Sequence, residues 1–288
     1  MFQIFFIAAV IVLVGFGYKT ALADTPAYIV IPTTGVTDMG AQINASIAAN
    51  GPGKYLLPPG HYSAATTINP PVSITLECAG AGNVPFGSSR GTCVISFRAG
   101  VDGFTCGTSA NGSSIKGISF YSLGTSVGSN NGINIGCSFF NASGIVVQKF
   151  GNDGMHFDSS ATGAGNSNHW VVQNIQSMYN YRDGFHWRGT DVNAGQCIGC
   201  SSAGNGRYGF DDTEGGLSNT IIGAISNGEG VGSYNLGKYN VWITPYCEGS
   251  STGTMHIKGH GNVVMSVLFG ACAITEAQPG SDYLIGYH

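Results

Sequence analysis

A short block centred on glycine recurs along the middle of this chain, and it constrains the fold more than any other sequence feature. The central positions of six copies are separated by 22 to 31 residues. Strand-like blocks that repeat at such intervals are typical of coils that stack into a solenoid, where residues one repeat apart become neighbours in space. The copies are residues 102–106, 131–135, 153–157, 183–187, 208–212 and 239–243.

Apolar and polar residues alternate within each block, as expected of a strand with one buried side. Asp212 on the apolar side would be costly to bury, which indicates either a strand irregularity or a functional role. Asn180, Asn205 and Asn227 stand at predicted turns, where amides can bond from coil to coil. We predict an all-β, single-stranded right-handed parallel β-helix. Its inward rows are Phe104, Ile133, Met155, Phe185, Phe210 and Val241, then Cys106, Ile135, Phe157, Trp187, Asp212 and Ile243.

The segment before the repeats is typical of a capping element. Thr37 and Asp38 can cap a short N-terminal helix over residues 42–48, whose apolar side would cover the open end of the coil stack. Without such a cap the first coil would expose unpaired strand edges. We predict a strand at residues 54–57 and a rigid turn at residues 58–62 after this helix.

This opening resembles the first coil of β-helix domains in the pectate lyase superfamily. The likeness lies in residues 35–38 (Gly-Val-Thr-Asp), 41–47 and 55–62 (Tyr-Leu-Leu-Pro-Pro-Gly-His-Tyr). The usual lead-in is replaced by residues 31–35, and Met39 stands where a second Asp is common. The resemblance implies a pectin lyase-like parallel β-helix. It leaves the activity open, because the superfamily includes lyases, hydrolases, epimerases, phage tailspikes and proteins without known catalysis.

The first 23 residues are predicted to be a secretory signal peptide. An apolar stretch at residues 4–14 precedes Ala-Leu-Ala at residues 21–23, which has the small residues of a cleavage site. The stretch is shorter than the roughly 20 residues that cross a bilayer. We therefore expect a secreted protein, extracellular or periplasmic, with no membrane span after cleavage. Residues 24–288 are predicted to form a single domain, with residues 24–70 as its cap and first coil.

Composition excludes one class of partner. The chain has 11 Lys and Arg against 15 Asp and Glu, and only 9% of its residues are charged. Such a chain has no basic surface to hold a phosphate backbone, so no nucleic-acid partner is expected.

Eight cysteines are expected to be oxidised or buried in an exported chain. Their pairing cannot be read from the sequence. Cys197 and Cys200 have the spacing of a zinc knuckle, but no second pair or histidine partner completes four ligands. Disulfides or buried single thiols are therefore favoured over zinc.

The few charged residues gather on the outward side of neighbouring blocks. Histidines and carboxylates occupy the position two residues after the block centre, and acids also precede the central glycine. We predict one functional site here. Its predicted catalytic residues are His156, His186, Asp158, Asp183, Arg188 and Asp211, and its predicted substrate-binding residues are Asp153, Arg182, Tyr208 and Trp242.

The coil spacing allows a hydrolytic or a metal-assisted site. Equivalent residues lie about 4.8 Å apart on adjacent coils and about 9.6 Å apart two coils away. Asp158 and Asp211 would then lie near the upper end of the roughly 6.5–9.5 Å separation used by inverting glycosidases. Asp153 and Asp183 would be close enough to share a Ca²⁺ ion. The sequence leaves the metal open and indicates no other cofactor.

Elimination from a uronic acid is also open. It requires a base at the α-proton and a cation on the sugar carboxylate. His156 or His186 could be the base, and Arg188 or Ca²⁺ the cation. An alternative site at residues 259–261 (Gly-His-Gly) with Asp211 and Asp212 resembles two of the four polygalacturonase motifs, but the other two are missing.

We predict a secreted polysaccharide lyase or glycoside hydrolase acting on a pectin-like or other extracellular glycan, with a polysaccharide or oligosaccharide as its partner. The alternative is a non-catalytic secreted β-helix, an adhesin, envelope or glycan-binding protein that uses the same face for recognition only.

Overall fold

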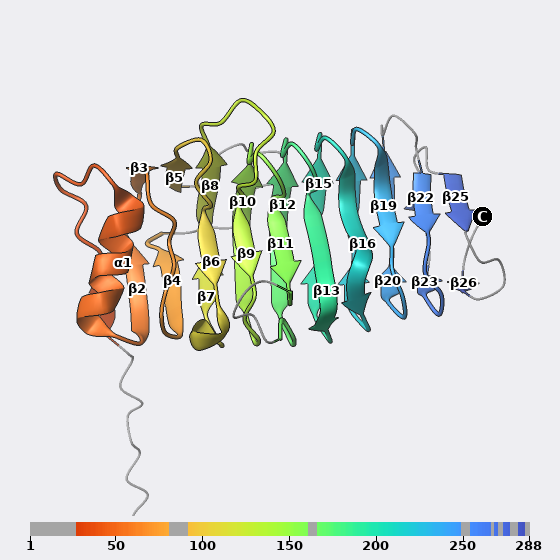
Figure 1. The fold of residues 1–288 in the computed structure, drawn as a ribbon, viewed down its shortest axis with the longest axis horizontal. Helices are drawn as coiled ribbons and strands as arrows, with labels where there is room; N and C mark the ends of the chain where they lie inside the picture. The colour runs from red at the N-terminus through yellow and green to blue at the C-terminus, as the bar shows by residue number, and fades with distance from the viewer. Residues whose placement is uncertain are drawn as a thin grey trace, which may run out of the picture.

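A computed structural model describes residues 27–80, 92–160, 166–248, 254–265, 268–269, 273–276 and 282–285. The described residues form a stack of coils that runs from the helix α1 (Met39–Asn50) at one end to the strands β25 and β26 at the other (Figure 1). Every strand pairing is parallel, and each strand pairs with the equivalent strand of the next coil. The predicted parallel β-helix is confirmed. The predicted signal peptide lies outside the described residues.

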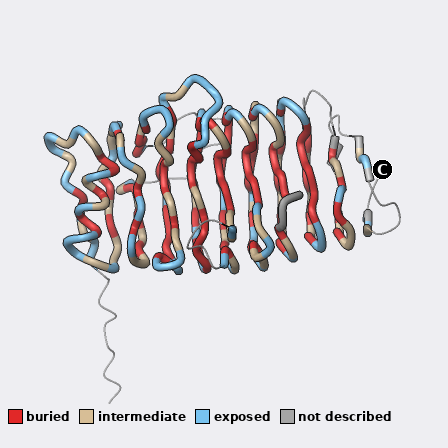
Figure 2. Tube along the Cα trace, in the orientation of Figure 1, coloured by how far each residue is buried: buried red, intermediate tan, exposed pale blue. Residues whose placement is uncertain are grey.

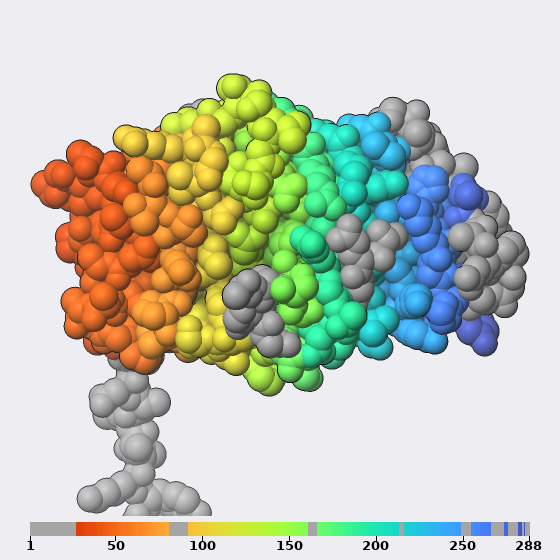
Figure 3. Space-filling model, in the orientation of Figure 1, coloured from red at the N-terminus to blue at the C-terminus, as the bar shows by residue number. Residues whose placement is uncertain are grey.

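One sheet, called sheet B, carries the glycine-centred blocks and is turned toward the viewer in Figures 1 and 3. Its eight strands are β6 (Phe104–Cys106), β9 (Ile133–Ile135), β11 (Met155–Asp158), β13 (Phe185–Asn193), β16 (Tyr208–Leu217), β19 (Gly232–Leu236), β22 (Thr254–Ile257) and β25 (Ala273–Glu276).

The other sheet, called sheet A, consists of two ladders that share the long strands β10 (Asn141–Gln148) and β12 (Val171–Met178). The remaining strands of the first ladder are β1 (Tyr28–Val30), β2 (Gly53–Leu57), β4 (Ile74–Cys78), β7 (Ser114–Lys116), β14 (Gln196–Ile198), β17 (Thr220–Ile222), β20 (Val241–Ile243), β23 (Val263–Met265) and β26 (Tyr283–Ile285). Those of the second are β3 (Gly60–Ala64), β5 (Cys93–Phe97), β8 (Ile118–Ser122), β15 (Ser201–Ala203), β18 (Ile225–Asn227), β21 (Tyr246–Glu248) and β24 (Leu268–Phe269), and a single 3₁₀ turn, η1, spans Thr108–Ala110.

The helix α1 covers the N-terminal end of the stack, as predicted (Figure 1). Asp38 caps it by accepting a hydrogen bond from Ala41 N at 3.2 Å, and Ile43 and Ile47 are buried against the first coil. The predicted rigid turn at residues 58–62 is wrong in its second half. Strand β3 begins inside it, because the backbone there pairs with β5.

The core consists of apolar side chains stacked from coil to coil. Figure 2 shows that buried residues recur in successive coils along the stack. The Phe185 and Phe210 rings are parallel with centroids 4.7 Å apart, and Tyr234 continues the stack 5.2 Å beyond Phe210. Such offset or parallel aromatic pairs add to the free energy gained by apolar burial. The first predicted inward row is confirmed from Phe104 to Phe210. At Asp212 the strand registers shift between β13 and β16, so the predicted irregularity is also confirmed.

The sixth glycine-centred block was assigned to the wrong sheet. Val241 and Trp242 lie in β20 of sheet A, and the next strand of sheet B is β19, in which Tyr234 pairs with Phe210. Trp242 is 1% exposed and packs edge-on against the ring of Tyr234. A Val-Trp-Ile run alternates in the same way in either sheet. The sequence therefore did not reveal that residues 241–243 belong to sheet A and not to sheet B.

A first asparagine ladder, comprising Asn180, Asn205 and Glu229, runs through the turns of three coils. Asn180 N donates to Asn205 Oδ1 at 2.9 Å, and Asn205 N donates to Glu229 Oε2 at 2.6 Å. The prediction that Asn227 belongs to this ladder is wrong. Ser202 pairs with Ser226, so the residue three positions further on, Glu229, takes the place of Asn205, and Asn227 is exposed.

A second asparagine ladder, comprising Asn219, Asn240 and Asn262, lies at another corner and was not predicted. Asn219 N donates to Asn240 Oδ1 at 2.9 Å, and Asn240 N donates to Asn262 Oδ1 at 3.1 Å. The amide of Asn240 also donates to the buried carboxyl of Asp212. These contacts satisfy buried polar groups that would otherwise destabilise the turns.

Disulfides between described residues join Cys78 to Cys93, Cys106 to Cys137 and Cys197 to Cys200. The pairing of Cys197 with Cys200 accounts for their close spacing without zinc, and agrees with the preference for disulfides or buried thiols. Among the described residues, no helix is long and apolar enough to cross a membrane.

Candidate functional site

Most of the predicted site residues meet on the outer side of sheet B. The strand register places His156 beside His186 and His186 beside Asp211 on three successive coils. Two further residues continue this row, Asn235 on β19 and His256 on β22. They were missed because the sixth block was assigned to sheet A residues.

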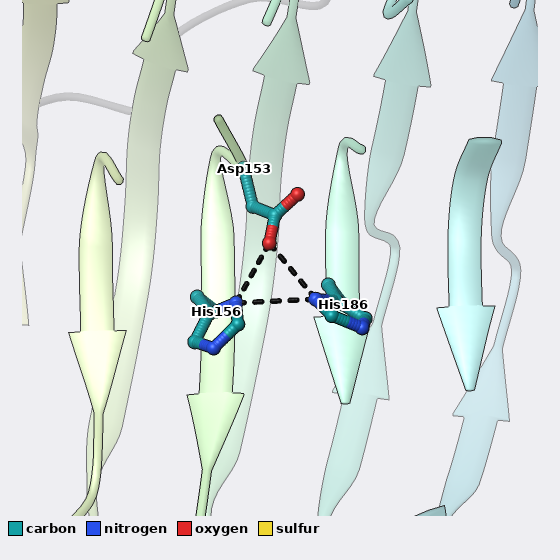
Figure 4. Close-up of side chains that lie close together, drawn as sticks. All are labelled: Asp153, His156 and His186. Atoms are coloured by element: carbon teal, nitrogen blue, oxygen red, sulfur yellow. Dashed lines mark hydrogen bonds and ion pairs between the residues drawn. The ribbon is translucent and has the colours of Figure 1, made fainter. Parts of the chain in front are cut away.

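Asp153 joins two coils of this row (Figure 4). Its Oδ2 lies 2.7 Å from Nδ1 of His156 and 2.8 Å from Nδ1 of His186, and the two Nδ1 atoms are 3.2 Å apart. Asp153 and His186 are fully buried, and His156 is 5% exposed. The row therefore faces outward from the coil, as predicted, but most of it is covered and not solvent-exposed.

Asp158 lies at the edge of this buried group. Its Oδ2 is 3.4 Å from Nε2 of His156, while its Oδ1 accepts hydrogen bonds from Ser160 N at 2.7 Å and from Ser160 Oγ at 2.6 Å. The carboxylate is thus held in one orientation and remains partly exposed.

Arg207 binds Asp183 and Asp211, which lie on the two coils after that of Asp153. Arg207 was not among the predicted site residues. Its Nε donates to Asp183 Oδ1 at 2.8 Å, and its Nη2 donates to Asp183 Oδ2 and to Asp211 Oδ2. Asn235 Nδ2 donates to Asp211 Oδ1 at 2.8 Å. Arg207 occupies the position in its coil that Arg182 has in the preceding one, and this equivalence was the available signal. We call Asp153, His156, Asp183, His186, Arg207 and Asp211 the charged cluster.

The surroundings shift the pKa values of several carboxyl groups in and near the charged cluster. Burial opposes ionisation of Asp153, but hydrogen bonds from His156 and His186 outweigh it and hold the pKa of Asp153 below its ordinary value. Burial raises the pKa of Asp183 to about 6 against the stabilising effect of Arg207, with repulsion from Asp153 adding to the rise. Burial also raises the pKa of Asp102, and its hydrogen bond from Asn131 only partly offsets this.

A groove of about 580 Å³ opens beside the charged cluster, across the first coils of sheet B. Four predicted site residues line it, and so does Asp102, which was not predicted as a site residue. Thr105, Asn131, Asn134 and Asn152 add polar groups to its wall. The four predicted residues are His156, Asp158, Arg182 and Arg188.

The other predicted site residues lie outside the groove lining. Asp153, Asp183, His186 and Asp211 are buried within the charged cluster. The pairing of Asp158 with Asp211 across one substrate is therefore not what the structure shows, because Arg207 and Asn235 bind Asp211.

Neither predicted aromatic contact lines the groove. Tyr208 lies against Arg207, whose guanidinium carbon is 5.3 Å from the ring centroid. The assignment of Trp242 to substrate binding is wrong, since it is a core residue of sheet A. The alternative site at His260 is not assembled with Asp211 either, since His260 Nε2 lies 2.9 Å from Tyr239 Oη in another turn.

The donor set near Asp153 and Asp183 does not fit Ca²⁺. This ion prefers six to eight oxygen ligands. Arg207 binds both carboxylate oxygens of Asp183, and two imidazoles face Oδ2 of Asp153. Ca²⁺ therefore has no role in the chemistry proposed below.

No family model matches the chain, and a search of curated proteins finds no match. Solved structures do match. An alginate lyase from Paenibacillus sp. str. FPU-7 superposes with a TM-score of 0.58 and 13% identity, covering 91% of this chain and 98% of the lyase. The pectate lyase Pel9A superposes with a TM-score of 0.54 and 16% identity. This match covers 89% of this chain and 73% of Pel9A.

This chain has the fold of the pectate lyase β-helices. The resemblance read from residues 35–62 is confirmed at that level. Two phage proteins also match, ORF18 of Geobacillus virus E2 and the tailspike gp49 of the Acinetobacter baumannii bacteriophage Fri1, a capsular polysaccharide depolymerase. Their TM-scores are 0.58 and 0.57, at 15% and 13% identity. The matches cover 90% and 85% of this chain, which spans 59% and 52% of their lengths.

Proposed function

We propose that this protein is a secreted enzyme that cleaves an acidic polysaccharide in the groove of sheet B. The observation that carries the proposal is the composition of the groove wall. In a chain with few charges, it combines two arginines with two carboxyl groups and a histidine. The polysaccharide-active proteins with the same fold support the choice of a glycan as substrate.

The arginines favour a substrate that carries carboxylates. Arg182 and Arg188 are partly or largely exposed and line the groove. Guanidinium groups bind carboxylates with paired hydrogen bonds, as a uronic acid would require. Asn134 and Thr105 lie where they could bond to sugar hydroxyls. Pectin-like or other uronate-containing extracellular glycans are therefore the proposed substrates.

The two carboxyl groups have different surroundings. Burial raises the pKa of Asp102, which favours its protonated form and a role as general acid toward the leaving oxygen. Asp158 is fixed by Ser160 and His156, so its carboxylate can act on a water molecule or on the proton next to the substrate carboxylate. Hydrolysis and elimination both use such a pair.

The test is to incubate the mature chain with pectic, alginate and capsular glycans. New reducing ends without ultraviolet absorbance indicate hydrolysis, while absorbance from an unsaturated uronate indicates elimination. Asp158→Asn should abolish either product. Asp191→Asn is the matched control, because Asp191 is also a hydrogen-bonded carboxylate but does not line the groove.

Binding without turnover in wild type would instead favour the alternative, a non-catalytic glycan-binding β-helix. Neither binding nor turnover across the panel would overturn both. Secretion has its own test, since amino-terminal sequencing of the exported protein should begin at Asp24. The disulfides support an oxidising location.

A further inference from the structure

We propose that Asp153, His156 and His186 form a binding site for one divalent transition-metal ion. The inference goes beyond the proposed glycan activity and does not depend on it. It rests on the arrangement of three donor atoms drawn from two neighbouring coils (Figure 4).

The distances between the donor atoms fit a common ion. Zinc binds imidazole nitrogen and carboxylate oxygen at about 2.1 Å, so two adjacent ligands lie about 3.0 Å apart in octahedral and about 3.4 Å apart in tetrahedral geometry. The Asp153 oxygen is 2.7 and 2.8 Å from the two Nδ1 atoms, which are 3.2 Å from each other. These three atoms therefore form one triangular face of a coordination sphere after shifts of a few tenths of an ångström.

The ligand types restrict the ion. Two imidazoles and one carboxylate suit zinc and the other first-row divalent ions, whereas Ca²⁺ and Mg²⁺ prefer oxygen ligands alone. Three protein ligands leave positions for water or a substrate oxygen. His156 also lines the groove, so the ion would have a route from solvent.

The surroundings orient the ring of His156 for this role. A metal-bound imidazole usually directs its other nitrogen to a carboxylate, which fixes the ring. Nε2 of His156 lies 3.4 Å from Asp158 Oδ2. Oδ1 of Asp153 accepts from Asp183 N at 3.2 Å, which leaves Oδ2 toward the histidines.

Asp183, His186 and Asp211 form a second triangle of donor atoms, but it is not the proposed site. The guanidinium of Arg207 already bonds to both of its carboxylates. A positive group bonded to both carboxylates neutralises them and would repel an incoming cation. Arg182 also lies near the first triangle, but its Nε is 3.8 Å from Oδ1 of Asp153, whereas the histidines face Oδ2. The ion is therefore assigned to the first triangle alone.

The experiment uses the exported chain without a histidine tag, stripped with a chelator and dialysed. Isothermal titration with Zn²⁺ and Co²⁺ should show one ion per chain, Co²⁺ should give a visible absorption band, and Ca²⁺ should give no heat. Bound Zn²⁺ should also raise the unfolding temperature, since a ligand that binds only the folded state stabilises it. None of these readouts requires a substrate.

The variants use residues that occur naturally at equivalent positions on neighbouring strands of sheet B. His156→Asn places in β11 the residue that the adjacent strand β9 has at the same position, Asn134, so the fold should tolerate it. It should weaken Zn²⁺ binding at least about tenfold, since even outer partners change metal affinity by about 10- to 100-fold. His256→Asn, in the same row on β22, is the matched control and should bind as wild type does.

Three outcomes would overturn the proposal. The first is no binding of Zn²⁺ or Co²⁺ by the folded wild type, which would leave a hydrogen-bonded group only. The second is equal affinity in wild type and in His156→Asn. The third is an equal loss in His256→Asn. If the wild type binds no metal but cleaves a glycan, the metal site is excluded and the proposed function is supported. If it binds metal but cleaves no glycan, the proposed function is excluded and the metal site is supported.

Discussion

The asparagine ladders and the charged cluster are both stacks of buried polar side chains, yet they differ in chemistry. In the second asparagine ladder each amide receives the backbone N–H of the residue one coil before, so Asn219 and Asn240 repeat one bond. In the charged cluster Asp153 and Asp183 also repeat one bond, since each accepts the backbone N–H of the residue one coil on, but their other contacts differ. Asp153 bonds to two histidines, and Asp183 bonds to an arginine from the following coil.

Under the proposed function, one stack serves the structure and the other serves the chemistry. The amides of a ladder bond to buried backbone N–H groups at their own corner, which holds the turns in register. The charged cluster concentrates ions that are costly to bury unless paired, and it opens into a groove through His156. We infer that the ladders stabilise the coil and that the groove side of the cluster serves the chemistry.

The largest expected effect is on turnover, at the groove. Asp102→Asn keeps a side-chain oxygen to accept the hydrogen bond from Asn131 N but removes the acid proton. Because general acid catalysis contributes about 10²- to 10⁴-fold, kcat on a cleaved glycan should fall by at least about 100-fold. Initial rates measure this. Asn227→Ala, at an exposed position, should leave kcat unchanged, and an unchanged kcat in Asp102→Asn would remove this residue from the site.

A variant in the second asparagine ladder should lose stability and keep its turnover. Asn240→Ala removes the bonds to Asn219 N and to the carboxyl of Asp212, both buried. Leaving two buried groups without these partners should lower the free energy of unfolding by about 3 kcal/mol. Urea unfolding measures this, and kcat should change little at temperatures where the variant is folded. A large loss of kcat without loss of stability would contradict the division between ladder and cluster.

The one acid in the first ladder makes stability depend on pH. Burial raises the pKa of Glu229 to about 7 from 4.5, despite hydrogen bonds from Ser202 and Asn205. The folded chain thus holds a proton on Glu229 that the unfolded chain releases between these values. The contribution of Glu229 to stability is therefore greatest below pH 4.5 and falls as the pH rises to 7. The loss should reach at most about 3 kcal/mol and then level off.

Glu229→Gln should remove this part of the pH dependence. Urea unfolding at pH 5 and pH 8 gives the comparison, and the variant should be more stable than wild type at pH 8. Equal slopes in both proteins would show that Glu229 is ionised in the fold and that the ladder tolerates a charge.

The smallest effect concerns substrate binding. Arg188→Ala removes an exposed cation from the groove and should raise KM for an acidic glycan about tenfold, which corresponds to about 1.4 kcal/mol. Lys116→Ala, on sheet A, is the control. Steady-state kinetics on acidic and neutral glycans distinguish the cases, because a neutral substrate should not respond to Arg188. An equal effect on both would exclude carboxylate recognition.

Much of the architecture could be predicted because a coil repeats its own pattern. Phe185 and Phe210, 25 residues apart, share a row, and this followed from strand alternation and the glycine centres alone. The adjacency of His156, His186 and Asp211 followed in the same way. The prediction failed at Trp242 and Asn227, where coils of unequal length moved an identical pattern to another corner.

The sequence alone therefore determined the stacking, the inward rows and the strand positions of the candidate residues, because a period of two places each side chain on one side of its strand. Only the tertiary structure decided which outward residues are exposed. Arg207 reaches across to Asp183 and Asp211, and Asp102 joins the groove from two coils before His156. Coverage by long side chains depends on three-dimensional packing, and strand alternation carries no information about it.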